Sequence, residues 1–373
     1  MIIGIPSETK TSEHRVGLTP ESVHELVGNG HRVLVQSGAG SGIQITDSAY
    51  RAQGAKIVKS AREVFAAAEL IVKVKEPQMP EAAMLRPGQI LFAYLHLAAS
   101  SRLTRALIKS RAVCIAYETI DAADGSLPLL APMSQIAGRL AAQAAASALQ
   151  SNNGGCGKLL SGASGVPPAK IVILGAGVVG TNAALIASGM GAAVTVLDRS
   201  VKALDRIQSR LGMTVRTAVA NRSRIAAEIG TADAVIGCVL IPGAAAPRLI
   251  SRQMLKTMAP GSALVDVAID QGGCFATSRP TTHERPTYIV DKIVHYCVAN
   301  MPGAVSHTAT YALNNATLPY VLKLAKHGWL AALSADAHFA RGLAIAHGQL
   351  ACVQSGRALK IKTVDPKKLL AEK

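Results

Sequence analysis

Aromatic residues are scarce in this 373-residue chain, where they make up 3% of the sequence and include a single tryptophan. Proteins that bind single-stranded nucleic acid stack the bases on aromatic side chains, and few such platforms are present here. The chain is nevertheless basic, with a formal net charge of +16, but no run of five like charges occurs. We therefore expect no nucleic acid and no membrane among its partners. The positive charge is better suited to attracting small anionic molecules.

Closely spaced cysteines are also missing. The chain has six cysteines, and none of them forms a Cys-x-x-Cys pair. Their scatter argues against a compact zinc site and a disulfide framework, and it is typical of reduced thiols in the cytoplasm. The N-terminus reaches Glu8 before a signal-peptide core is complete, so we expect a cytoplasmic protein. Glu118 and His327 could belong to a metal site, but neither has neighbours at the spacing of metal ligands, so we predict no metal site.

One stretch, residues 171–197, lacks charged side chains altogether and is long enough to span a bilayer. Five glycines interrupt it, however, and no aromatic belt flanks it. The stretch is better explained as a buried strand (Ile171–Leu174), a glycine-rich turn, a helix and a second strand (Val194–Leu197). We therefore expect no transmembrane helix here.

The turn after the first of these strands has the pattern Gly175-x-Gly177-x-x-Gly180. The first glycine permits a tight turn, the second lets the backbone approach a pyrophosphate, and the third allows close packing of helix on strand. Asp198 ends the second strand, where a dinucleotide site places the acid that accepts hydrogen bonds from the adenosine ribose. The glycines alone are a weak signal in a chain with 33 of them. The complete series in register predicts a dinucleotide site.

The length of the chain exceeds the size at which single cores usually stop growing, so two domains are expected. The first third alternates short apolar runs with segments of helix length. The expected strands there are Ile2–Ile5, Arg32–Gln36, Leu70–Val74, Ile90–Ala93 and Val113–Ala116, and the expected helices are Pro20–Asn29, Asp47–Gly54 and Ser100–Ser110. After Asp198 we expect helix Val201–Leu211, strand Ala234–Leu240, helix Arg248–Met258, strand Ala263–Ile269, and short strands Tyr288–Val290 and His295–Val298.

Two long helices are expected to connect the domains. Residues 134–150 are rich in alanine, which favours close packing against another helix, within the chain or across a subunit interface. Residues 304–327 form the second helix, and the lysine-rich tail from Lys360 is expected to be solvated. The predicted fold class is α/β. It has a Rossmann dinucleotide-binding domain (129–303) inserted in a second Rossmann-like α/β substrate domain (1–128 and 304–373), joined by the long helices.

Several motifs point to one family. They are GIPSETKTSEHRVGLTP (4–20), VKVKEP (72–77), LHLA (95–98), LPLLAPMSQIAGRLAAQ (127–143), the glycine turn, LVDVAIDQGGCF (264–275), SRPTTH (278–283) and YCVANMPGAV (296–305). Together they resemble the alanine dehydrogenase family, which includes the soluble subunit of transhydrogenase. The resemblance implies reversible NAD-dependent deamination of L-alanine to pyruvate and ammonium by a homohexamer. Another amino-acid or opine-type dehydrogenase, or a transhydrogenase-like binding subunit, stays an alternative.

Removing hydride and ammonia from an amino acid needs a cation for the carboxylate, a polar group for the carbonyl oxygen and a proton acceptor. Arg15, Lys75, His96 and Asp270 have suitable chemistry, although a lone Arg or Lys is usually a surface charge and a lone His a satisfied core residue. The resemblance implies that Arg15 and Lys75 bind substrate and that His96 and Asp270 are the acid/base residues. We assign His96 to the substrate oxygen and Asp270 to the ammonium or the attacking water. The reverse division stays open.

The resemblance also implies a set of cofactor-binding residues: Ser134, Gly175, Gly177, Val178, Gly180, Asp198, Val239, Leu240, Asn300 and Met301. Val239 and Leu240 could equally be strand core. The family often has a basic residue near position 203, where this chain has Ala203, with Arg199 and Lys202 nearby instead. We expect NAD as the cofactor because a carboxylate at Asp198 would face the 2′-phosphate of NADP, but Arg199 could attract that phosphate.

Overall fold

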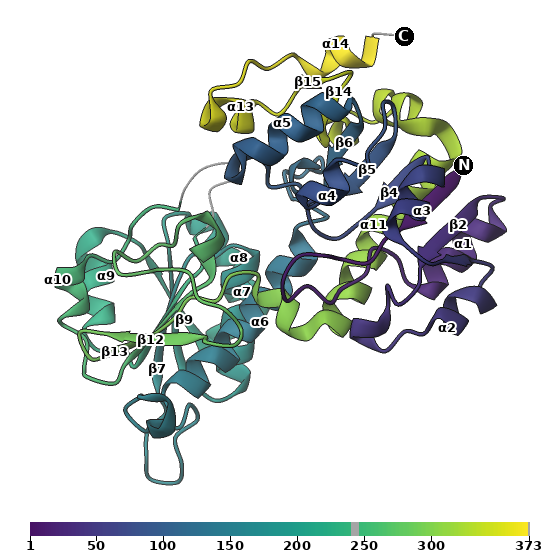
Figure 1. Ribbon diagram of the computed structural model, residues 1–373. Helices are drawn as coiled ribbons and strands as arrows, with labels where there is room; N and C mark the ends of the chain where they lie inside the picture. Colours follow the sequence, from purple (N-terminus) through teal and green to yellow (C-terminus); the bar gives the residue numbers. More distant parts are fainter. Residues whose placement is uncertain (240–245, 372–373) are drawn as a thin grey trace. The chain divides into compact units, whose positions relative to one another are not determined.

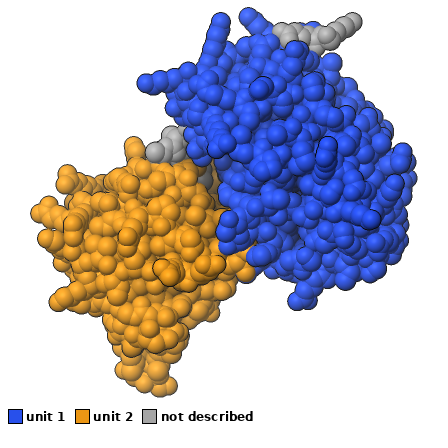
Figure 2. Space-filling view, in the orientation of Figure 1, with its two compact units in different colours: residues 1–133, 305–373 blue, residues 134–304 orange. Residues whose placement is uncertain are grey.

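The computed structural model describes residues 1–239 and 246–371. Within them the chain forms two compact units, one made of residues 1–133 and 305–373 (unit 1) and the other of residues 134–304 (unit 2), coloured separately in Figure 2. Each unit is built on a largely parallel β-sheet with helices along its crossovers. The predicted α/β fold class with two domains is therefore confirmed.

The sheet of unit 1 has eight strands in the order β15-β14-β6-β5-β4-β1-β2-β3 (Figure 1). The strands are β1 (Ile2–Ile5), β2 (Arg32–Gln36), β3 (Lys56–Val58), β4 (Leu70–Val72), β5 (Ile90–Ala93), β6 (Val113–Ala116), β14 (Leu343–Ala346) and β15 (Gln349–Leu350). Strands β1 to β6 pair in parallel, and β14 and β15 add an antiparallel edge. The helices of this unit are α1 (Pro20–Gly28), α2 (Asp47–Ala52), α3 (Ala61–Ala67), α4 (Met79–Ala82), α5 (Ser101–Ser110), α11 (Ser306–Ser334), α12 (Ala337–Ala340), α13 (Val353–Leu359) and α14 (Pro366–Ala371).

The sheet of unit 2 has seven strands in the order β12-β13-β11-β10-β7-β8-β9. The strands are β7 (Lys170–Leu174), β8 (Ala193–Asp198), β9 (Val215–Val219), β10 (Ala234–Gly237), β11 (Ala263–Asp266), β12 (Thr287–Val290) and β13 (Ile293–Tyr296), and only the β12–β13 pair is antiparallel. Helix α6 (Ala131–Ala148) leads into this unit, and its other helices are α7 (Val178–Gly189), α8 (Val201–Leu211), α9 (Arg222–Ile229) and α10 (Arg252–Leu255).

The two parallel sheets share one topology. In unit 1 the chain builds β1, β2 and β3 outward and then returns to the other side of β1 to build β4, β5 and β6. In unit 2, β7, β8 and β9 are followed in the same way by β10, β11 and β13. Ligands of such doubly wound sheets bind beyond the carboxyl ends of the strands, where the order reverses. The expected binding points are therefore the loops after β1 and β4 in unit 1 and after β7 and β10 in unit 2.

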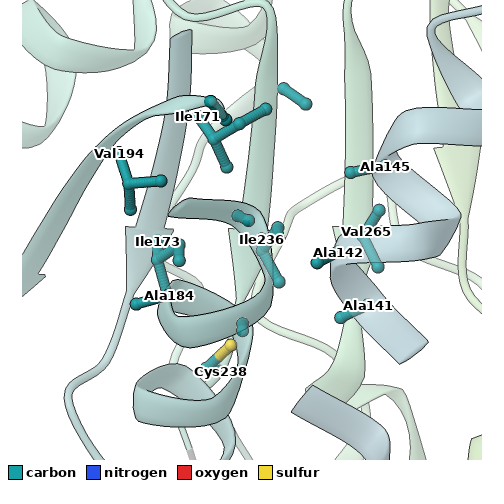
Figure 3. Packing of buried hydrophobic residues seen from close by; sticks show 14 of the residues in the cluster. Ala141, Ala142, Ala145, Ile171, Ile173, Ala184, Val194, Ile236, Cys238 and Val265 are labelled. Atoms are coloured by element: carbon teal, nitrogen blue, oxygen red, sulfur yellow. The ribbon is translucent and has the colours of Figure 1, made fainter. Parts of the chain in front are cut away.

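The alanine-rich helix α6 packs against α7 within the chain, which confirms one of the two partners expected for it. A Cβ at Gly138 would lie 2.2 Å from the carbonyl oxygen of Val179, so only glycine permits this approach. Figure 3 shows small residues of α6 (Ala141, Ala142 and Ala145) beside Ile236 and Val265 of the sheet. Small side chains bring the helix close enough to bury the sheet without large aromatic residues.

Several expected elements differ from the structure. The expected strand Ala263–Ile269 ends at Asp266, because the Asp266 carboxylate accepts the N–H of Ala268 and starts the 3₁₀ helix η6 (Val267–Gln271). The expected helix Arg248–Met258 shrinks to α10, since Ile250 pairs in extended form with Phe275. The strand expected at His295–Val298 lies two residues earlier, as β13.

The C-terminal segment also differs from the expectation. Val364 donates its backbone N–H to Leu350, and Leu369 on α14 is fully buried, so the tail expected to be solvated packs on unit 1 as far as it is described. The long return helix α11 consists of two helices joined across Gly328, whose φ of 72° and ψ of 164° are not helical, so the first begins at Ser306 and ends near His327, as expected. The helix is joined to the N-terminal part of unit 1 through Asn314, whose side-chain oxygen accepts the N–H of Thr19 at 2.7 Å.

Candidate active site residues and dinucleotide site

The reversal point of the unit 1 sheet is filled by a buried carboxylate, Glu8, in the loop after β1. Its Oε1 accepts the backbone N–H of Val74 at 2.7 Å, and its Oε2 accepts that of Lys75 at 3.4 Å, directly after β4. The burial of Glu8 raises its pKa, although Lys73 and the Val74 N–H oppose this. Glu8 therefore connects the two loops at the reversal point and fixes the backbone from which Lys75 projects.

Lys73 stabilises this arrangement from inside the protein. Its side chain has no exposed surface, and its Nζ lies 3.1 Å from Glu8 Oε2 and 2.9 Å from Glu81 Oε1. Burial alone would lower the pKa of Lys73, but the two carboxylates reverse this and raise it. Lys73 therefore stays protonated, and its positive charge compensates for the cost of burying the two glutamate carboxylates.

His96 follows β5, one strand along from Lys75, and the two side chains meet. The Nζ of Lys75 lies 3.4 Å from the Nε2 of His96. An ammonium can only donate, so Nε2 accepts this hydrogen bond and the neutral ring carries its proton on Nδ1. The ring also stacks on Tyr94, with 5.9 Å between the centroids. The structure brings together these two residues that the sequence predicted for the site.

The environment of His96 favours the neutral imidazole. The pKa of His96 lies below its ordinary value, first because the surrounding protein desolvates the ring and also because of the Lys75 cation, while Glu118 acts in the opposite direction. The residue still has solvent-accessible surface, so the ring is reachable by a small molecule. A proton acceptor that stays neutral near pH 7 is what general-base chemistry requires.

Arg15 has a different setting from the one expected. It is 1% exposed, and its Nε and one Nη donate to both carboxylate oxygens of Glu13, at 2.6 and 2.5 Å. The other Nη lies 3.0 Å from the sulfur of Met133. The forked face of the guanidinium formed by Nε and the first Nη therefore already holds a carboxylate of the protein.

In unit 2 the glycine turn follows β7 at the reversal point of the sheet, and it fits a dinucleotide. Gly175 has a φ of 108°, and a Cβ at Gly180 would lie 1.8 Å from the Gly175 carbonyl oxygen. A Cβ at Gly177 would meet nothing within 4 Å, so the backbone there is open to a ligand. Val178 begins α7 and is 44% exposed. Free N–H groups at the start of a helix are suited to binding a pyrophosphate.

Asp198 ends β8 beside this turn. Its Oδ2 accepts the N–H of Ala176 at 2.6 Å, and its Oδ1 accepts that of Ser200 at 2.8 Å. The side chain thus holds the turn and leaves lone pairs on both oxygens, since each carboxylate oxygen can accept two hydrogen bonds. Arg199 is exposed, whereas Ala203 is buried on α8. These features fit a ribose that carries no phosphate and whose hydroxyl groups donate hydrogen bonds to Asp198.

Asp270 lies on the 3₁₀ helix η6 and is exposed, so it does not end a strand as expected. Its two carboxylate oxygens accept the N–H of Asn300 at 3.2 and 3.4 Å. Asn300 has a left-handed backbone with φ of 56°, and the adjacent Met301 is buried. The structure therefore brings together three predicted residues, Asp270, Asn300 and Met301, from two loops of unit 2.

The remaining predicted residues are less informative. Ser134 is partly exposed on α6, and Val239 follows the end of β10, with its Cγ2 3.2 Å from the position of a Cβ at Gly175. Val239 is therefore part of the turn region and not strand core. Leu240 lies outside the described residues. Across residues 1–239 and 246–371, no group of three or more His, Cys, Asp or Glu could hold a metal ion, Glu118 and His327 included.

The sequence matches two parts of one family, described as "Alanine dehydrogenase/PNT, N-terminal domain" over residues 4–137 and "Alanine dehydrogenase/PNT, C-terminal domain" over residues 141–352. The chain belongs to the alanine dehydrogenase/PNT family. It is 52% identical to an alanine dehydrogenase of Halomonas elongata, over 99% of this chain and 100% of that protein. It is 50% identical to one of Mycobacterium tuberculosis over 100% of both chains.

Solved structures agree with this membership. An L-alanine dehydrogenase matches with a TM-score of 0.93 and 47% identity, over 96% of this chain and 99% of that one. A transhydrogenase from Sinorhizobium meliloti matches with a TM-score of 0.80 and 26% identity, over 94% of this chain and 98% of that one. Among the described residues, no helix combines the length and apolar character that crossing a membrane requires. As a family member, the chain is an oxidoreductase of the dehydrogenase type. Its dinucleotide-binding fold implies a nicotinamide dinucleotide as the cofactor.

Four carboxylates near these sites were not predicted from the sequence as structural supports: Glu8, Glu13, Glu118 and Asp266. Asp266 is fully buried, and it accepts the N–H of Cys274 at 2.8 Å and the hydroxyl of Ser278 at 2.5 Å. Burial raises its pKa, with these hydrogen bonds opposing the shift. The available signal was the position of each acid beside a strand end or in the polar loop after β1, which alone does not tell a support from a catalytic group.

Proposed function

We propose that this protein is an NAD-dependent alanine dehydrogenase. It catalyses the reversible conversion of L-alanine, water and NAD to pyruvate, ammonium and NADH, in the class of oxidoreductases that act on CH–NH₂ donors. The observation that carries the proposal is the contact of Lys75 with His96, 3.4 Å apart at the ends of adjacent strands. A module that only binds dinucleotide has no need for an accessible imidazole paired with a lysine.

Four residues of the chain have roles in the proposed reaction. Arg15 and Lys75 bind the substrate, with the Lys75 ammonium polarising the carbonyl oxygen of pyruvate or the corresponding hydroxyl. His96 exchanges the proton of that oxygen, since a histidine with a lowered pKa is available as a base near neutral pH. Asp270 orients the ammonium or the attacking water. The reverse division between His96 and Asp270 is the alternative.

The cofactor is held by the turn at Gly175, Gly177, Val178 and Gly180, with Asp198 on the ribose. Ser134, Val239, Leu240, Asn300 and Met301 complete the proposed contacts. A bound nicotinamide supplies the hydride acceptor. NAD is preferred over NADP because the Asp198 carboxylate repels a 2′-phosphate, and exposed Arg199 is the residue that could oppose this preference.

The test is a coupled pair of absorbance measurements at 340 nm. Purified protein with pyruvate, ammonium and NADH is expected to consume NADH, and protein with L-alanine and NAD to produce it. Omitting ammonium is the control, because a 2-oxo acid reductase would still consume NADH. No change in either direction, from protein that binds NADH, would contradict the proposal.

Two alternatives have distinct outcomes in the same assay. Another amino-acid or opine-type dehydrogenase would use a different amino acid or 2-oxo acid in place of alanine and pyruvate. A transhydrogenase-like subunit, the alternative favoured by the 26% identity to the Sinorhizobium meliloti protein, would bind NADH without consuming it with either substrate.

We further propose a homohexamer in the cytoplasm, with α6 and the apolar surface near it contributing to assembly. Light scattering at micromolar concentration is expected to give about six times the mass of the 38.6 kDa chain. A monomer would contradict the assembly without affecting the proposed reaction.

A further inference from the structure

We propose that Glu118 is a positioning residue for His96, holding the backbone that presents the imidazole and supplying a negative charge that opposes the Lys75 cation at the ring. The proposal goes beyond the roles given above and rests on the proposed function where it concerns turnover. Glu118 lies on the short 3₁₀ helix η3 (Tyr117–Thr119), which follows β6, and so stands one strand along from His96.

The contacts are between the Glu118 carboxylate and the backbone of residues 95 and 96. Its Oε1 accepts the N–H of His96 at 2.7 Å, and both of its oxygens lie 3.2 Å from the N of Leu95. His96 has a left-handed backbone, with φ of 45° and ψ of 39°, which residues other than glycine rarely adopt. One carboxylate therefore holds the two N–H groups at a turn that the chain does not favour by itself.

The second part of the role is electrostatic. The charged groups around the His96 ring are Glu118 after β6, Lys75 and Glu76 after β4, and Lys10 in the loop after β1. The two carboxylates favour the imidazolium and the two ammonium groups oppose it, with Glu118 the stronger of the carboxylates. Lys10 is paired with Glu76 at 2.5 Å, and at the His96 ring Glu118 is the carboxylate that acts most strongly against the Lys75 charge.

The same arrangement occurs one strand away, which supports a specific role. Glu8 accepts the N–H groups of Val74 and Lys75, just as Glu118 accepts those of Leu95 and His96. Each residue of the Lys75–His96 pair thus projects from a backbone fixed by its own carboxylate. Glu8 is balanced by buried Lys73, whereas Glu118 is partly exposed and acts on the titrating ring.

The test compares Glu118→Gln with wild type in the full-length protein. Histidine labelled at Cε1 is followed by NMR across pH, and the His96 signal is assigned by its loss in His96→Asn. Glutamine keeps an oxygen for one N–H group but removes the charge, so the pKa of His96 is expected to fall by about one unit. The acid limb of kcat/KM for L-alanine is expected to move to lower pH by the same amount.

Two further variants complete the design. Glu25→Gln removes a carboxylate from the exposed face of α1 in the same unit, and it is expected to leave the pKa of His96 unchanged. Glu118→Asp keeps the charge on a shorter side chain, so it is expected to lower kcat through the lost N–H contacts while the pKa moves less than in Glu118→Gln. It also provides the test if Glu118→Gln does not fold.

An unchanged His96 pKa in Glu118→Gln, or a pKa that moves equally in Glu25→Gln, would overturn the proposal. A wild-type pKa together with reduced thermal stability would show that Glu118 only supports the fold. The NMR titration needs no turnover, so its result stands even if the protein fails to convert alanine, and failure of the proposed function is seen separately at 340 nm.

Discussion

The parallel strands of both sheets follow the same order and reverse at the same place, yet the two reversal points are filled in different ways. In unit 1 the loops after β1 and β4 bring charged side chains together, with Glu8, Lys73 and Lys75 in contact through side chain or backbone. In unit 2 the loop after β7 is a turn of glycines with open backbone at Gly177. One topology thus provides titratable groups in unit 1 and backbone N–H donors in unit 2.

The two reversal points also share a device. A carboxylate beside a strand end accepts backbone N–H groups of a neighbouring loop: Glu8 and Glu118 do so in unit 1, and Asp198 in unit 2. Such bonds are charge-assisted and stronger than those between neutral groups. In each unit, therefore, an acid beside a strand end supports the backbone of a neighbouring loop.

The largest expected effect concerns the backbone site of unit 2. Gly180→Ala puts a Cβ 1.8 Å from the Gly175 carbonyl oxygen, so the turn has to move and detectable NADH binding is expected to be lost. The measurement is NADH fluorescence titration. Gly189→Ala at the end of the same helix is the matched control, because a Cβ there meets nothing within 4 Å. Equal binding by both variants would mean that the turn does not hold the dinucleotide.

The next effect concerns the titratable groups. His96→Ala and Asp270→Asn are each expected to lower kcat by about 10² or more, the usual scale for acid/base groups. Steady-state kinetics with pyruvate, ammonium and NADH provide the measurement. Asp270 is the exception to the division between the units, because it is a proposed acid/base residue on a loop of unit 2. Near-normal turnover in either variant would make that residue structural.

A smaller effect is expected at Asp198. Asp198→Asn keeps an oxygen for the Ala176 N–H but removes the charge, so the ratio of kcat/KM for NAD over NADP is expected to fall about tenfold, equivalent to about 1.4 kcal/mol. Asp205→Asn on the exposed face of α8 is the control. A ratio that stays constant in Asp198→Asn and changes in Arg199→Ala would assign the selectivity to Arg199.

The smallest effect is a shift of pH dependence. The pKa of His96 is lowered, mainly by desolvation, so the ring stays neutral to a pH below its ordinary value of about 6.5. The acid limb of kcat/KM for L-alanine is therefore expected below about pH 6.5. Lys75→Gln removes an opposing cation and is expected to move the limb upward in the residual activity. A wild-type limb clearly above that value would show that His96 is not the titrating group.

Much of the fold could be predicted from the sequence because buried parallel strands are continuous apolar runs. The bounds of β1, β2, β5 and β6 agree with the prediction. Strand β9 was missed because it is an edge strand in which polar and partly exposed residues break the apolar run. Strand β14 was missed although it is apolar, since its antiparallel pairing with β6 joins residues more than 200 positions apart and has no local signal.

The candidate sites were predictable to a similar degree. The glycine turn was visible because its conformation demands glycine at fixed spacing, as the φ of Gly175 and the contact of Gly180 illustrate. Partners brought together by folding were not visible. Glu13 is only two residues from Arg15, but its contact with the guanidinium depends on the loop conformation, which the sequence does not indicate. The contact of Glu118 with the backbone of His96 depends on the strand order, which has no local signal either.

We propose that unit 2 holds the dinucleotide, while the proton chemistry comes from unit 1, with Asp270 of unit 2 as the exception. The most direct test is the NADH dissociation constant of His96→Ala beside that of wild type, measured by fluorescence titration on the same preparations used for kcat. The account predicts that the two constants agree within about threefold, a difference of less than 1 kcal/mol, while kcat falls by about 10² or more. Loss of NADH binding in parallel with the loss of kcat would contradict it.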